Sequence, residues 1–218
     1  MTEFVLADAF YGCKKIKTIT VDSDNTKYGI EDGILYEKNN GQLVSVLFVP
    51  NALTGAVEIP STVTSINEAT FSGKSGITSI SFANNQASGD LVLGASVFAN
   101  MTSLTEVRLP AGLKVIPLNA FKGSSITSVY VPNSVEKVMP GAFANCKKLT
   151  TIAIPDRAIY IGNAAFSNCN ALGTVTINET SKLQRIATGA FSNCTSLRSI
   201  FIPKTVRQID LPDIPKDE

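Results

Sequence analysis

The chain has 218 residues, of which 44% are hydrophobic, and a net charge of +1 from 19 Lys and Arg against 18 Asp and Glu. This composition is apolar enough for a folded core, which excludes a disordered chain. The absence of His excludes His-dependent catalytic triads, His general bases and His metal ligands. The near-balanced charge gives no sign of a surface for nucleic acid or for anionic membrane.

The two ends of the chain are expected to belong to a longer protein. No apolar stretch is long enough to span a bilayer, and the first ten residues lack the basic and apolar regions of a signal peptide. A repeated pattern already begins at Ala9-Phe10. Residues 210–218 are rich in Pro and charge, which indicates a tail or linker. We therefore expect a fragment that does not itself insert into a membrane.

Phenylalanine recurs along the chain, each time after a small or β-branched residue. The positions are Phe10, Phe71, Phe98, Phe121, Phe143, Phe166 and Phe191, and from Phe71 onward the intervals are 27, 23, 22, 23 and 25 residues. Apolar residues follow each Phe in nearly the same register, and the last two stand two apart, as Val107 and Leu109 do. That alternation predicts a strand with one buried face. The strands are expected near 16–21, 77–82, 104–109, 126–131, 149–154, 172–177 and 197–202.

Two further signals recur in each repeat. Pro often ends the expected strand, because it lacks the N–H that a ladder needs. A second short apolar pair then follows, such as Leu113 and Ile116. The residue two after the Phe is always Gly or Asn: Gly12, Gly73, Asn100, Gly123, Asn145, Asn168 or Asn193. These residue types enter the left-handed backbone region most readily, which predicts a turn of fixed shape in every coil. Repeats of this size bury their apolar faces only by stacking, so the pattern predicts a solenoid.

The unit at 142–161, with Ala-Phe-x-Asn-Cys-x-x-Leu-x-x-Ile-x-Ile-Pro, resembles the BspA-like leucine-rich repeats. This resemblance implies a right-handed leucine-rich-repeat solenoid with a parallel β-sheet on one face, forming a single unit over 1–209. Residues 22–60 resemble the longer coil found among such repeats. Within it, Asn39-Asn40-Gly41 between two apolar runs predicts a hairpin.

The four cysteines, Cys13, Cys146, Cys169 and Cys194, each lie three residues after a repeat Phe. Stacked side chains in register point the same way, which disfavours disulfides, so we expect all four to be reduced core residues. Asp22 and Asp24 lack the remaining ligands of a calcium loop and are expected in a solvated turn. No metal and no cofactor are predicted.

No catalytic constellation is recognisable. The acidic residues scatter over the repeats without a common register, and Gly73-Lys74-Ser75 lacks the rest of a phosphate-binding loop. We therefore expect no enzymatic activity.

The outward residues of the expected strands offer the candidate binding face. Most are Ser, Thr or Ala, whereas Glu106, Arg108, Ser128 and Tyr130 place an anion, a cation, a hydroxyl and an aromatic ring on adjacent coils. Arg and Tyr are enriched at interface hot spots, and the coil spacing allows Arg108 to stack on Tyr130. The resemblance implies a cell-surface or secreted module whose concave sheet face binds a protein partner, such as a host or matrix protein, in adhesion. The alternative is a carbohydrate-binding region or a purely structural stalk.

Overall fold

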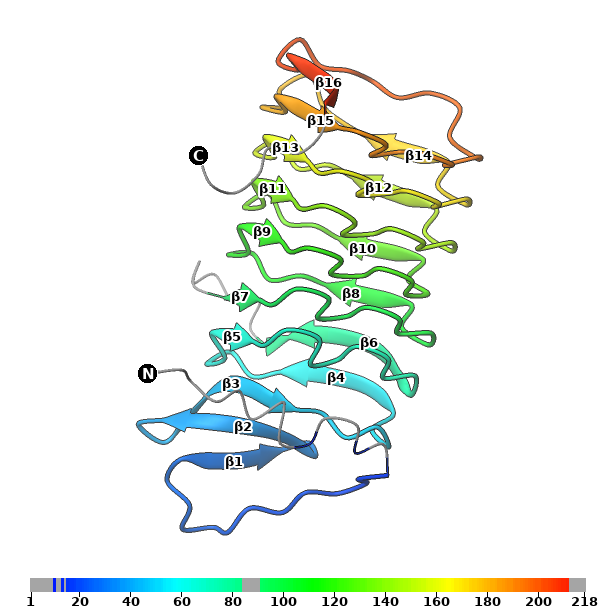
Figure 1. Ribbon diagram of the computed structural model, residues 1–218. Coiled ribbons are helices and arrows are strands. Elements are labelled where there is room, and N and C mark those ends of the chain that lie inside the picture. The colour runs from blue at the N-terminus through cyan, green and yellow to red at the C-terminus, as the bar shows by residue number, and fades with distance from the viewer. Residues whose placement is uncertain (1–9, 11–12, 14, 84–90, 212–218) are drawn as a thin grey trace.

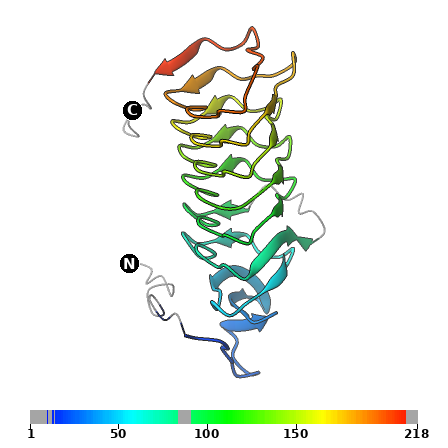
Figure 2. The same cartoon turned by 90° about the vertical axis from the view of Figure 1, so that its right-hand side faces the viewer.

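The computed structural model describes residue 10, residue 13, residues 15–83 and residues 91–211, and these form an elongated stack of β-coils (Figures 1 and 2). The strands lie in two columns that run the length of the stack. Both columns are built mainly of parallel strands, as a solenoid requires, because each coil repeats the path of the one before. The predicted solenoid fold is confirmed.

The first column follows the strands that the Phe register predicts, except for its first strand, which lies outside the predicted ranges. It consists of β4 (Gly55–Ile59), β6 (Ile77–Phe82), β8 (Glu106–Arg108), β10 (Ser128–Tyr130), β12 (Thr151–Ala153) and β14 (Thr174–Thr176). Within this column β4, β6, β8 and β10 form one parallel sheet and β12 and β14 another. Strand β6 coincides with the predicted range 77–82, and β8, β10, β12 and β14 lie inside their predicted ranges.

The second column arises from the short apolar pairs, for which the sequence predicted no strand. It contains β3 (Gln42–Phe48), β5 (Ser65–Ile66), β7 (Val92–Leu93), β9 (Val115–Ile116), β11 (Lys137–Val138), β13 (Tyr160–Ile161), β15 (Arg185–Ala187) and β16 (Gln208–Leu211). Strand β16 extends to Leu211, so the first two residues of the expected tail belong to a strand.

The longer coil forms the N-terminal part of the second column. Strands β1 (Tyr28–Glu31) and β2 (Ile34–Asn39) pair antiparallel, and β2 pairs in the same way with β3. The turn between β2 and β3 contains Asn40 and Gly41 with φ of 49° and 76°, which confirms the predicted hairpin.

Two predicted strands are absent: residues 16–21 and 197–202 form none. Residues 16–21 precede the hairpin and join no ladder with β4, the end strand of its sheet. Residues 197–202 leave the path of β14, and in the described chain no further coil covers their inward face, so Ile202 is 41% exposed (Figure 1). A strand needs both a ladder partner and a buried face; neither segment has a ladder partner, and the apolar side chains of both are at most half-buried.

Each coil turns at two left-handed residues, which flank the Phe at equal distance. Two residues after it lie Gly73, Asn100, Gly123, Asn145, Asn168 and Asn193, as predicted; Gly12 is outside the described residues. Two residues before it lie Ala69, Ser96, Asn119, Gly141, Ala164 and Gly189, a turn that the sequence did not reveal. All twelve have φ between 51° and 72°. The Phe side chain is therefore held at a corner of fixed shape.

The core is a stack of matched side chains between the two columns. The rings from Phe71 to Phe191 lie with centroids 5.1–5.6 Å apart from one coil to the next. Three buried thiols, those of Cys146, Cys169 and Cys194, each donate to the carbonyl oxygen of the Phe one coil earlier, at 3.0–3.1 Å. Cys13 is exposed, so its prediction as a core residue was wrong. The motif position alone does not bury a thiol; the three buried thiols each pack on the Phe of the coil before them.

Candidate binding face

The four predicted site residues lie on two neighbouring strands of the first column. Strands β8 and β10 pair in parallel, with Glu106 opposite Ser128 and Arg108 opposite Tyr130. In each strand the central Val points toward the core and its two neighbours are exposed. Strand alternation therefore brings all four side chains to one outer surface, as the sequence predicted.

Arg108 and Tyr130 form a cation–π pair on this surface. The guanidinium carbon of Arg108 lies 5.4 Å from the centroid of the Tyr130 ring, which confirms the predicted stacking. Arg108 forms no ion pair with Glu106, although the structure describes both side chains. Tyr130 is 55% exposed despite the contact. The pair thus holds a large ring and a charge in place at the surface.

Hydroxyl groups line the rest of the face and brace its edge. The outward residues of the neighbouring strands are Ser79, Ser81, Thr151, Ala153, Thr174 and Thr176. Just ahead of the strands, the hydroxyl groups of Thr105, Thr127 and Thr150 each donate to the backbone oxygen of the equivalent Thr one coil earlier, at 3.2–3.4 Å. This Thr ladder ties successive coils together beside Arg108 and Tyr130.

A second cation–π pair lies on the outer surface of the second column, where the sequence indicated no strand. The guanidinium carbon of Arg185 lies 5.6 Å from the Tyr160 ring centroid, and the two residues are opposite each other in the ladder between β13 and β15. The signal that could have found this pair is the recurring second apolar pair, because Ile161 and Ile186 fix which neighbours point outward.

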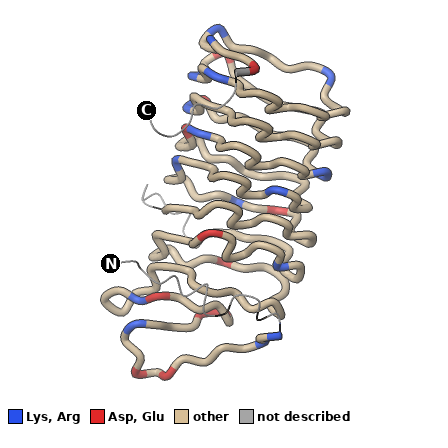
Figure 3. The backbone as a smooth tube through the Cα atoms, viewed as in Figure 1, with Lys and Arg blue, Asp and Glu red and all other residues tan. Residues whose placement is uncertain are grey.

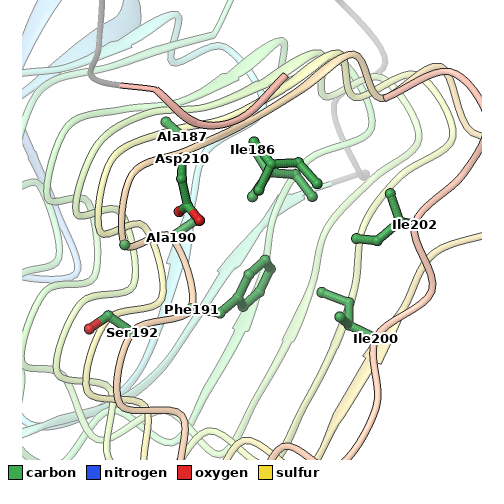
Figure 4. Close-up of a pocket in the computed structure, with 10 residues that line it drawn as sticks. Ile186, Ala187, Ala190, Phe191, Ser192, Ile200, Ile202 and Asp210 are labelled. Carbon is green, nitrogen blue, oxygen red and sulfur yellow. The ribbon is translucent and has the colours of Figure 1, made fainter. Parts of the chain in front are cut away.

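An open apolar pocket of about 380 Å³ lies at the C-terminal end of the described coils. Figure 4 shows the Phe191 ring facing Ile200 and Ile202, with Asp210 at the rim. The lining is almost wholly apolar, so among the described residues this pocket exposes one end of the core and offers no pair of groups for acid–base chemistry.

The remaining polar clusters have structural partners. The Asp22 carboxylate accepts a hydrogen bond from the backbone N–H of Asp24 at 2.9 Å, which places both in a local turn. No group of three or more Cys, Asp or Glu side chains suited to a metal ion occurs among the described residues. Within the same ranges no helix is long and apolar enough to cross a membrane.

The geometry agrees with what sequence comparison finds. The model of the BspA-type leucine-rich repeat region matches residues 43–89 and 91–211, with six copies. The chain belongs to this family. A comparison with curated proteins finds no match. The family match begins at the second strand of the hairpin and continues to the last strand of the solenoid, so it covers both columns.

Solved structures of bacterial proteins share the fold of this BspA-type chain. A leucine-rich repeat protein from Eubacterium ventriosum is 23% identical, with a TM-score of 0.65 over 95% of this chain and 56% of that one. One from Bacteroides ovatus is 23% identical, with a TM-score of 0.64 over 89% of this chain and 53% of the other.

A third solved structure is described as a leucine-rich cell surface protein from Faecalibacterium prausnitzii. It is 24% identical, with a TM-score of 0.57 over 93% of this chain and 44% of its own length. The chain therefore spans about half the length of the solved relatives.

Proposed function

We propose that this BspA-type segment is a non-enzymatic module of a cell-surface or secreted protein, and that it binds a protein partner in adhesion. The binding site is the outer surface of β8 and β10, formed by Glu106, Arg108, Ser128 and Tyr130. The observation that carries this proposal is the cation–π pair of Arg108 and Tyr130 on an otherwise hydroxyl-rich face.

An ordered Arg–Tyr pair suits protein recognition for two physical reasons. Tyr and Arg are the residue types that contribute most to binding at protein interfaces. Because the two side chains are already stacked, binding costs less side-chain entropy than it would for two free side chains. The Thr ladder beside them further limits movement of the coils. The Ser, Thr and Ala residues around the pair can pack against a partner without selecting it.

The comparisons support the proposed location at the cell surface. The family is that of BspA-type repeats, and one solved relative is described as a cell surface protein. An extended stack of coils also presents a long surface that a partner can reach, which is how repeat proteins commonly bind.

The test is binding of the purified segment to a panel of immobilised extracellular matrix proteins, measured by biolayer interferometry. We expect at least one of them to bind, and the double variant Arg108→Ala, Tyr130→Ala to weaken that binding by about tenfold or more. The matched control on the same face is Thr174→Ala, Thr176→Ala, which should change affinity little.

Both variants must melt at the wild-type temperature, because the mutated side chains are exposed. Binding that survives the double variant at full strength would place the site elsewhere on the molecule. If the segment binds none of the matrix proteins, the alternative of a purely structural stalk is favoured.

A further inference from the structure

Charge is distributed unevenly along the chain, although the total is near zero. Residues 107–211 contain twelve Lys and Arg but only four Asp and Glu, a net charge of +8. Residues 1–106 carry a net charge of −5. The C-terminal coils therefore form a basic body with a positive potential at its surface.

Five residues on the outer edge of the second column concentrate this charge. We name them the basic ladder: Lys114, Lys137, Tyr160, Arg185 and Arg207. The ladder registers place Lys137 beside Val115, then Tyr160 beside Lys137, then Arg185 beside Tyr160. Lys114 and Arg207 belong to the residues just ahead of β9 and β16, which are also linked from coil to coil by backbone hydrogen bonds. Figure 3 shows Lys and Arg recurring along the edge that carries β9 to β16.

The spacing of the basic ladder is set by the backbone. Adjacent parallel strands lie about 4.8 Å apart, so five successive coils span about 19 Å. Lys137, Tyr160 and Arg185 share one row of this edge, and Lys114 and Arg207 stand in the row one residue earlier, at its two ends. Lys114, Lys137 and Arg207 are exposed, whereas Tyr160 and Arg185 are half-buried. The ladder is therefore fixed at its centre and solvated at its ends.

Few acidic groups lie near this edge, and one of them, the exposed Asp210 of β16, stands at the C-terminal pocket. Glu136 lies 3.8 Å from Lys114, and because both side chains are about half exposed, the ion pair is weak and easily exchanged for another anion. The Asp156 carboxylate accepts hydrogen bonds from the Asn178 amide and the Thr180 hydroxyl, each at 2.8 Å. These bonds hold it within its own corner of the coil.

Neutral hydrogen-bonding groups stand between the cations. The exposed amides of Gln184 and Gln208 flank Arg185, and the Tyr160 ring stacks on its guanidinium. Amides bind hydroxyl groups, which a carbohydrate carries on every ring. The stacked guanidinium covers one face of the Tyr160 ring, so this ring is poorly placed as a platform for a nucleic-acid base.

We propose that the basic ladder binds a linear acidic polysaccharide, whose carboxylate or sulfate groups contact Lys114, Lys137, Arg185 and Arg207 in successive coils. A polymer with recurring charges matches cations that recur along the stack of coils, and its sugar hydroxyls pair with the amides of Gln184 and Gln208. This site lies on the second column, so it is independent of the protein-binding face on β8 and β10.

The test measures binding of fluorescein-labelled heparin and polygalacturonate by fluorescence anisotropy at several salt concentrations. Dextran serves as the neutral polymer and single-stranded DNA as a polyanion without sugar carboxylates or sulfates. The test variant is Lys137→Gln, Arg185→Gln, Arg207→Gln. The matched control is Lys122→Gln, Lys147→Gln, Lys148→Gln, which removes the same charge from exposed positions off the ladder.

We expect at least one acidic polysaccharide to bind, with an affinity that falls as salt rises, and dextran not to bind. The ladder variant should lose about tenfold or more in affinity and show a shallower salt dependence, while the control loses about threefold or less. If the ladder variant loses more affinity for heparin than for polygalacturonate, sulfate is the preferred group. The reverse result would identify carboxylate.

Three outcomes would overturn the proposal. Equal losses in the two variants would mean that overall charge, rather than the ladder, attracts the polymer. DNA binding as tight as that of the best polysaccharide would assign the edge to polyanions in general. If neither acidic polysaccharide binds the wild-type protein, the proposed polysaccharide site does not exist. Because Arg185 is half-buried, the variant Lys137→Gln, Arg207→Gln repeats the test without changing a packed side chain.

Discussion

The rings of Phe143 and Phe166 lie 5.1 Å apart at their centroids, with planes only 4° from parallel. This separation is close to the spacing of adjacent strands, so each ring is slightly offset on the next and fills the corner of its coil. Both side chains are fully buried. The ring stack is therefore a continuous part of the core rather than a set of separate contacts.

Replacing one ring in the middle of the stack should be costly. Phe143→Ala removes a fully buried side chain that touches a ring on each side, and we expect a loss of about 3–5 kcal/mol in the free energy of unfolding. Urea denaturation followed by circular dichroism measures this value. Phe191→Ala is the matched control, because Phe191 is half-buried at the pocket and stacks on one side only among the described rings, so its loss should be smaller. Equal losses at the two positions would contradict this account.

Ala164 adopts a left-handed backbone conformation that is strained for alanine, and glycine would relieve this strain. Ala164 has φ of 51°, a conformation that disfavours a Cβ, while its N–H donates to the Thr188 carbonyl at 3.0 Å. We expect Ala164→Gly to raise the free energy of unfolding by roughly 0.5–1 kcal/mol, because relief of strain exceeds the entropy cost of glycine. The neighbouring Ala165→Gly, which loses a buried methyl and relieves no left-handed φ, should destabilise the protein. If both Ala164→Gly and Ala165→Gly destabilise the protein, backbone strain at Ala164 is refuted.

Close approach of two coils should make one glycine irreplaceable. A Cβ added at Gly162 would lie 2.5 Å from the backbone nitrogen of Pro140 and 2.7 Å from the carbonyl carbon of Met139. Gly162→Ala therefore has to push the coils apart, and we expect it to lower the melting temperature and cost about 1–3 kcal/mol. Gly173→Ala is the control, since the nearest atom to its added Cβ is 3.8 Å away. A Gly162→Ala protein as stable as the Gly173→Ala protein would show that the coils move apart freely.

The cysteines should divide into one reactive thiol and three protected ones. Cys13 is exposed, so a thiol reagent should modify it in the native protein, whereas Cys146, Cys169 and Cys194 should react only after denaturant is added. Mass spectrometry of the labelled protein, with Cys13→Ser as control, distinguishes the sites. Rapid native labelling of the Cys13→Ser variant would contradict the buried thiol stack.

Stability should also decline in alkaline solution because of these thiols. Burial raises the pKa of Cys146 from 9.0 to about 12 and also raises the pKa of Cys169. Between pH 9 and pH 12 the unfolded chain therefore releases a proton that the folded chain retains, so the free energy of unfolding falls as pH rises. Urea titrations across this range should show a smaller decline for Cys146→Ala than for the wild type. An equal decline in the two proteins would assign the pH dependence to other groups.

The sequence predicts the first column well because an inward apolar residue in each strand is followed two residues later by a second apolar residue. Val107 and Leu109 alternate with outward residues, and the cation–π pair of Arg108 and Tyr130 follows from the same register. The left-handed turns after the Phe were likewise predictable, since Gly and Asn are the residue types that adopt a positive φ most readily and they alone occupy that offset.

The second column escaped prediction because its strands are too short for the pattern to show. In β9 and β11 only Ile116 and Val138 point inward, so no alternation can be read from them. The edge that carries Tyr160 and Arg185 was therefore not recognised as a surface. Residues 16–21 and 197–202 carry the right pattern and still form no strand, because pairing also depends on which coil lies alongside.

The uneven tilt of the ring stack has a mechanical consequence. The angle between successive ring planes falls from 46° at Phe71 and Phe98 to 1° at Phe166 and Phe191. Because each coil contacts mainly its neighbours, a force pulling on the two ends would peel coils away one after another instead of breaking the whole core at once. The peeling would meet the most uniform resistance where the rings are parallel, so a molecule under tension would lengthen in steps of about one coil.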